Sequence, residues 1–112
     1  MRYQFVFTDW FDRNLRTLRK HNPSLREDLA AFFEAFEAES HPVVPGTGGA
    51  RKARMAAKDR GKRGGYRVVY YFVVNENEVW LLTIYDKVKR ENLTAAEAAR
   101  IAKLIDDIQA AR

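Results

Sequence analysis

The chain has 112 residues, a formal net charge of +5 and no cysteine, and 46% of its residues are hydrophobic. This length predicts one domain over residues 1–112, and the absence of cysteine excludes disulfide frameworks, thiolate metal sites and cysteine nucleophiles. With only two histidines and no apolar run near the ~18 residues of a membrane span, we expect a cytoplasmic protein without metal, cofactor or membrane anchor.

The N-terminal residues predict a short strand followed by a helix. Residues 3–8 alternate aromatic and polar side chains, which is typical of a strand. A helix capped by Thr8 or Asp9 is expected over 9–20, where apolar residues recur at helical spacing. Asn22-Pro23 ends this helix because proline cannot continue the hydrogen-bond ladder.

A second helix is predicted directly after this break. Ser24-Leu25-Arg26-Glu27 has the pattern of a capping box, and the helix is expected to end near Glu39. Its apolar stripe comprises Leu25, Leu29, Phe32, Phe33 and Phe36. The stripe matches a buried helix face, so we expect it in the core, and the two helices should form a helical hairpin.

The second half of the chain predicts three consecutive strands. The glycine-containing loop 41–49 lacks the GK[ST] ending of a phosphate-binding loop. Strands are then expected over 50–57, 66–74 and 79–85, with a polar turn at 75–78 between the last two. Short connections between neighbouring strands favour an antiparallel meander.

A C-terminal helix closes the chain. Thr94-Ala95-Ala96-Glu97 is a second capping-box pattern. The apolar stripe that follows comprises Ala98, Ile101, Leu104, Ile105 and Ile108. The sequence therefore predicts an α+β fold of order β-α-α-β-β-β-α, with a mostly antiparallel sheet, a helical hairpin and a C-terminal helix.

The positive charge is concentrated in one segment. Between residues 51 and 67, eight side chains are basic and one is acidic, so the rest of the chain is close to neutral. The basic residues are Arg51, Lys52, Arg54, Lys58, Arg60, Lys62, Arg63 and Arg67. Such a concentration indicates a polyanionic partner, for which nucleic acid is the commonest candidate, although a solvated charged loop is the alternative.

Strand periodicity predicts that several of these cations share one surface. Lys52 and Arg54 fall on one face of strand 50–57, whereas Arg51 falls on the other. If the three strands are neighbours, five side chains converge on a concave surface of the sheet, with the loop 58–65 at its edge. These side chains are Lys52, Arg54, Arg67, Tyr85 and Lys87. Arginine and lysine gathered in this way would grip phosphates.

Three runs of residues are specific enough to compare with known families: GTGGARKAR at 46–54, RGKRGGYRVVYY at 60–71 and LTIYDK at 82–87. They resemble the HigB-like branch of the RelE toxins, within the RelE/ParE superfamily, and the resemblance extends over essentially the whole chain. It implies a RelE-like fold and a ribosome-dependent endoribonuclease that cuts mRNA in the decoding site and inhibits translation. It also implies a cognate HigA-like antitoxin that carries a helix-turn-helix. Operator DNA would then be bound only by the toxin–antitoxin complex, through the antitoxin.

Cleavage of RNA by an internal 2′-hydroxyl needs a base, a cation for the developing phosphorane charge and an acid for the leaving oxygen. Histidine usually supplies the acid and the base. Here His21 lies at a predicted helix end and His41 in a proline-flanked loop, so both are expected to be structural or surface residues. A site without histidine must use lysine, arginine or tyrosine.

The match to the family pattern implies a role for each of four residues. Lys52 is the candidate base with Arg54 beside it, because an amine among other cations gives up its proton more readily. Arg67 would stabilise the phosphate in the transition state, and Lys87 would assist or protonate the leaving group. Some relatives carry Tyr or His near the start of the last helix; here Leu93 and Thr94 stand there.

Further residues are expected to contact RNA or the ribosome; they are Arg51, Lys58, Arg60, Lys62, Arg63 and Tyr85. Tyr70, Tyr71 and Trp80 are able to stack on bases, but strands this apolar favour core packing for them. Two alternatives without cleavage stay open, a ParE-like gyrase inhibitor and a plain RNA- or ribosome-binding module. The cation density argues against the first, whereas the second requires the same phosphate contacts as a nuclease.

Overall fold

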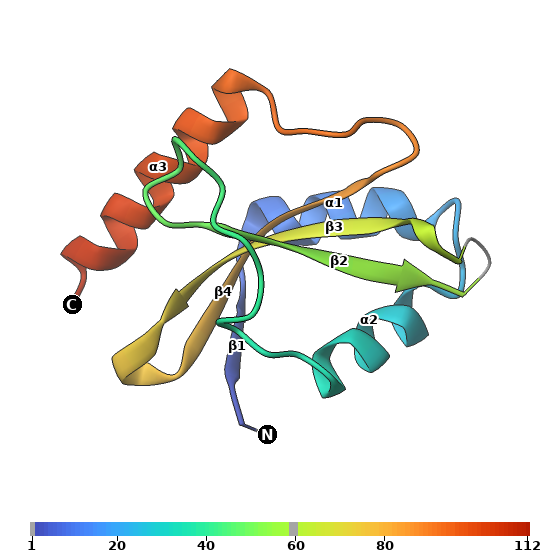
Figure 1. The fold of residues 1–112 in the computed structure, drawn as a ribbon, viewed down its shortest axis with the longest axis horizontal. Helices are drawn as coiled ribbons and strands as arrows, with labels where there is room; N and C mark the ends of the chain where they lie inside the picture. The colour runs from blue at the N-terminus through green and yellow to red at the C-terminus, as the bar shows by residue number, and fades with distance from the viewer. Residues whose placement is uncertain (1, 59–60) are drawn as a thin grey trace.

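A four-stranded sheet in the order β1-β4-β3-β2 organises the fold (Figure 1). This computed structural model describes residues 2–58 and 61–112, and their side chains except those of 61–64. The strands are β1 (Gln4–Phe7), β2 (Arg51–Ala57), β3 (Gly61–Val73) and β4 (Glu78–Asp86). β2, β3 and β4 pair antiparallel, whereas β1 pairs parallel to β4. The predicted α+β class and mostly antiparallel sheet are confirmed.

The meander is longer than the sequence predicts. β3 begins at Gly61 rather than at residue 66, because the glycine-containing stretch before Tyr66 continues the pairing with β2 instead of forming a loop. At Gly65 the two backbones approach so closely that an added Cβ would lie 2.0 Å from the Met55 carbonyl oxygen. The turn to β4 contains the short 3-10 helix η1 (Val74–Glu76) and Asn77 in the left-handed conformation.

Helix α1 (Asp9–Arg19) begins where β1 stops pairing. Thr8 is its N-cap: the hydroxyl accepts a hydrogen bond from the Phe11 backbone N–H at 3.2 Å. The same hydroxyl donates to the Leu81 carbonyl at 2.8 Å, which ties the start of the helix to β4. Of Thr8 and Asp9, the two N-cap residues that the sequence allows, Thr8 is therefore the one used in the structure.

Helix α2 (Leu25–Glu34) corrects two expectations. Ser24 precedes it with φ −83° and ψ 1° and makes no side-chain capping bond, because its hydroxyl donates to Asn22 Oδ1 at 2.8 Å. The predicted capping box at Ser24 is therefore wrong. The helix also ends at Glu34 rather than near residue 39, since the N-terminal segment binds the following turn: Arg2 donates to the Phe36 carbonyl and Tyr3 accepts from the Ala38 N–H.

Helix α3 (Ala95–Ala110) starts with the predicted capping box, since Thr94 and Glu97 exchange both hydrogen bonds. The sheet separates two apolar clusters. One contains Phe11 of α1, Leu29 of α2 and Phe36 beyond α2, packed on strand residues such as Met55 and Tyr70. The other lies under α3 and includes Val69, Leu82, Tyr85, Ile101 and Ile105.

Three layers result, with α3 on one face of the sheet and α1 and α2 on the other (Figure 1). No helix in the described part of the chain is long and apolar enough to span a membrane.

Candidate functional site

An open cleft of about 600 Å³ brings together four of the predicted site residues. The side chains and backbone that line it belong to His41, Pro42, Lys52, Arg54, Arg67, Lys87, Glu91 and Asn92. The cations come from β2, β3 and the residue that follows β4. The predicted convergence of these three strands on one surface is therefore present in the structure.

The alternation along β2 sets the direction of its two cations. Ala53 and Met55 are buried in the cluster under α1 and α2, so Lys52 and Arg54 project on the opposite side. Arg54 is exposed and lies directly opposite Arg67 in the pairing with β3. Two guanidinium groups thus stand on neighbouring strands of one face, an arrangement that favours a bound anion.

Arg67 is a buried cation whose positive charge is only weakly compensated by other groups of the described chain. Its side chain is 6% exposed, and within the described chain its only hydrogen bond runs from Nη1 to the Tyr66 carbonyl at 3.4 Å. Burial lowers the pKa of Arg67, and the positive charge of Arg54 lowers it further. An arginine nevertheless remains protonated, so its free N–H groups are available to a phosphate.

Lys87 and Glu91 form the far wall of the cleft. Their side chains make an ion pair with Nζ and Oε1 3.6 Å apart, and the Lys87 backbone N–H is bonded to the Gly65 carbonyl at 3.2 Å. The sequence interpretation missed Glu91 and its neighbour Asn92. The four-residue spacing of Lys87 and Glu91 was the only signal, and it is weak outside a helix.

His41 also borders the cleft, but its ring is held by aromatic contacts. The ring stacks on Phe36 with centroids 5.6 Å apart and meets the edge of Tyr70 at 5.9 Å. Burial lowers the pKa of His41, and the nearby Arg51 lowers it further, so the imidazole is neutral at neutral pH. These contacts favour the structural role expected for this histidine; His21 lies exposed beyond α1.

Outside the four cations, the predicted binding residues whose side chains the structure describes do not line the cleft. Arg51 points to the opposite side and donates to the His41 carbonyl at 2.7 Å. Tyr85 is buried, donates to the Glu91 carbonyl at 3.3 Å and lies under the Arg90 guanidinium. Lys58 is exposed near α2. Arg60 and the side chains of Lys62 and Arg63 lie outside the described residues.

The strand aromatics take the core positions expected for them. Tyr70 is fully buried and donates to the Ala38 carbonyl at 2.5 Å. Tyr71 and Trp80 pack against the cluster under α3, where Tyr71 accepts a hydrogen bond from Gln109. None of the three lines the cleft.

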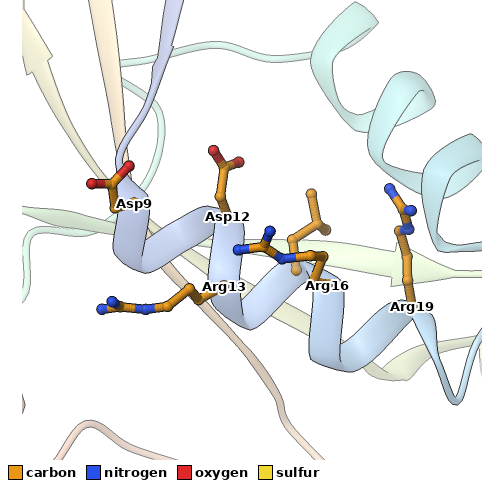
Figure 2. Close-up of a pocket in the computed structure, with 6 residues that line it drawn as sticks. Asp9, Asp12, Arg13, Arg16 and Arg19 are labelled. Carbon is orange, nitrogen blue, oxygen red and sulfur yellow. The ribbon is translucent and has the colours of Figure 1, made fainter.

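A second hollow runs along α1 and has a different character. Figure 2 shows its lining, in which Asp9 and Asp12 lie beside Arg13, Arg16 and Arg19, all on one helix. It shares no residue with the cleft, and all its lining residues come from one helix, whereas the cleft combines the predicted cations of separate strands and is the better candidate site. The described residues contain no group of three or more His, Cys, Asp or Glu able to hold a metal ion.

Comparison with protein families identifies the chain. The family model described as the RelE toxin of the RelE / RelB toxin–antitoxin system matches residues 5–112. This chain belongs to the RelE toxin family. It is accordingly a toxin of a toxin–antitoxin system, and the predicted relationship to RelE is confirmed.

Solved structures of E. coli RelE are similar to this RelE-family toxin at low identity. RelE in the intact E. coli RelBE toxin–antitoxin complex shares 20% identity, with a TM-score of 0.45 over 73% of this chain and 93% of that one. A doubly substituted E. coli RelE in the free state shares 21%, with a TM-score of 0.46 over 91% and 95%. Isolated E. coli RelE shares 16%, with a TM-score of 0.45 over 91% and 98%. The complex named here contains RelB, and the HigB-like branch and HigA-like partner stay predictions.

Proposed function

We propose that this toxin inhibits translation by cutting mRNA on the ribosome and that a cognate antitoxin neutralises it. The observation that carries the proposal is the cleft, where three other cations lie beside the buried guanidinium of Arg67, which has no hydrogen bond to a carboxylate within the described residues. Burying such a charge costs free energy unless an anion compensates it. The phosphodiester of an RNA strand supplies that anion, and membership of the RelE toxin family supports RNA as the substrate.

Each cleft cation is assigned one step of the cleavage. Lys52, in its neutral form, takes the proton of the 2′-hydroxyl, which attacks the adjacent phosphorus. Arg67 and Arg54 stabilise the negative charge that develops on the phosphorane oxygens. Lys87 donates a proton to the departing 5′-oxygen, so that the products are a 2′,3′-cyclic phosphate and a 5′-hydroxyl.

Further basic residues are proposed to hold the RNA and the ribosome outside the cleft. They are Arg51, Lys58, Arg60, Lys62 and Arg63, with Tyr85 as a less accessible member because it is buried. Their contribution is electrostatic attraction to phosphates, which positions the strand and does not read its sequence. A helix-turn-helix antitoxin of the HigA type remains the proposed partner, with operator DNA bound only by the complex.

Cleavage of mRNA on purified programmed ribosomes tests the proposal. Arg54→Ala removes an exposed cleft cation, and we expect a rate loss of roughly a hundredfold, as for other electrostatic contacts made in the transition state. Arg67→Met keeps the apolar stem of a buried residue and should lose at least as much. Arg26→Ala, which removes an exposed arginine of α2, should cleave at the wild-type rate.

Circular dichroism of every variant separates lost chemistry from lost folding. Wild-type cleavage by folded Arg54→Ala and Arg67→Met would contradict the proposed site. Ribosome binding with intact message would favour the binding module, whereas intact message with stalled replication in cells would favour a ParE-like gyrase inhibitor.

A further inference from the structure

A separate hollow lies between α2 and the end of β2. Its volume is about 340 Å³, and its lining consists of Asp28, Ala31, Phe32, Ala56, Ala57 and Lys58. It shares no residue with the cationic cleft. Methyl and phenyl groups form most of its walls, so one carboxylate is the outstanding polar group.

That carboxylate is incompletely satisfied. Asp28 is 9% exposed, and its Oδ1 accepts a hydrogen bond from the Lys58 backbone N–H at 3.2 Å. Its Oδ2 is buried and has no hydrogen-bond partner within the described part of the chain. A buried carboxylate oxygen without a donor is costly, and a donor entering the hollow would remove that cost. Because Oδ2 is buried, a donor in the hollow reaches it only after rotation about the broad χ2 torsion of Asp28.

The helix side of this hollow is acidic, whereas its strand side carries Lys58 of the basic segment. Residues 24–39 carry five acidic side chains and one basic one, in contrast to the basic segment at 51–67. Glu27 and Glu34 of α2 are exposed. Lys58 on the strand side is a proposed RNA contact, whereas the acidic side chains of α2 repel phosphate and favour the approach of a positively charged side chain from the helix side.

We propose that this hollow binds an arginine side chain presented by a protein partner. Its guanidinium donates to Asp28 Oδ2 while its methylene stem packs on Phe32 and Ala57. Arginine fits better than lysine, because the planar guanidinium is weakly hydrated and stacks on an aromatic ring. The exposed Lys58 side chain stays at the rim, where its backbone N–H already occupies the other carboxylate oxygen. The site goes beyond the proposed nuclease function and does not depend on it.

Titration of the labelled full-length toxin by NMR tests this site with a defined probe. N-acetyl-L-arginine amide should shift the methyl signals of Ala31 and Ala57 and saturate in the millimolar range. N-acetyl-L-citrulline amide has the same shape without the charge and should bind at least tenfold more weakly. Asp28→Asn keeps an oxygen acceptor for the Lys58 N–H and should lose the preference for arginine. Glu34→Gln, which neutralises an exposed acid of the same helix, is the matched control and should retain it.

Several outcomes would overturn the proposal. Equal shifts with citrulline, unchanged arginine binding in Asp28→Asn, or no shift of the two alanine methyls would each do so. If Glu34→Gln weakens arginine binding as much as Asp28→Asn does, general charge attraction explains the binding. That result would also refute a specific arginine site at Asp28. Because RNA is proposed to contact Lys58 beside the hollow, shifts of Ala31 with a short single-stranded RNA would contradict the assignment to a protein partner if Asp28→Asn abolishes them. Asp28→Asn should cleave mRNA normally, so failure of the nuclease proposal leaves this titration interpretable.

Discussion

Arg67 shows how a single residue can point to a ligand. Its neighbours in the pairing are Arg54 and Tyr85, and the carboxylate that acts on its charge is the more distant Glu91. A cation so placed is a poor choice for stability, because it is desolvated without a close partner. The arrangement makes sense when an external anion completes it.

Glu91 should weaken RNA binding because it partly neutralises Lys87 in the cleft. Glu91→Gln removes this charge at an exposed position, so we expect RNA affinity to rise by about 0.5–1 kcal/mol, or roughly two- to fivefold at low salt. Fluorescence anisotropy with a short single-stranded RNA measures the change. Glu34→Gln on α2 removes the same charge outside the cleft and should have no effect; equal gains in both variants would refute the local explanation.

At the scale of elements, the two capping-box patterns have different outcomes. Thr94 and Glu97 form the box, and Glu97 also binds the Arg90 guanidinium. Ser24 does not form one, because Asn22 accepts its hydroxyl hydrogen while the Asn22 amide is fixed to the Tyr66 hydroxyl at 2.8 Å. A contact with β3 thus overrides a local pattern that the sequence presents equally well.

Removing the two hydroxyls should therefore have unequal effects on stability. Thr94→Ala should lower the free energy of unfolding by about 1 kcal/mol, as loss of a helix cap does, and Ser24→Ala by at most about half as much. Urea denaturation of both variants measures the difference. Equal losses would contradict the distinction between the two helix starts.

The same cap has a predictable pH dependence. The hydrogen bond from Arg90 lowers the pKa of Glu97, and the hydrogen bonds from Thr94 add to this effect. A carboxyl whose pKa is lowered by folding stabilises the fold above its unfolded value and loses that contribution as the pH falls through the lowered one. The stability difference between wild type and Glu97→Gln should therefore be largest at neutral pH and shrink in acid, as urea denaturation at several pH values would measure.

Considering the whole molecule, two of its charged surfaces lie on different faces of the sheet. The cationic cleft opens on the face that α3 covers only in part, whereas the acidic α2 lies on the other face. This separation orients the protein in the field of a polyanion and leaves α2 available to a partner of the opposite charge.

The basic segment should determine the salt dependence of RNA binding. For each lost phosphate contact, the slope of log affinity against log salt should become shallower by about 0.7 for a single strand. Lys62→Ala and Arg63→Ala should each show this change, whereas Arg26→Ala on the acidic face should not. RNA binding measured over a range of salt concentrations tests this prediction. Unchanged slopes for Lys62→Ala and Arg63→Ala would refute a role for the basic segment in RNA binding.

The sequence by itself determined the element order, the strand faces of β2 and the group of cations that meet in the cleft. Those features follow from local periodicity, because a period of two places Lys52 and Arg54 together without knowledge of the fold. The sequence also singled out Arg67, because pairing between neighbouring predicted strands brings its side chain close to the cations of β2.

Only the tertiary structure decided the features that depend on contacts distant in sequence. The end of α2 is set by Arg2 and Tyr3, the hydrogen-bond partner of Arg51 is a loop carbonyl, and the extent of β3 is set by its pairing with β2. Glu91 enters the cleft, and Asp28 is buried without a donor for one of its oxygens, for the same reason. Periodicity records which side of its own element a residue occupies, but not which groups from other elements lie opposite it.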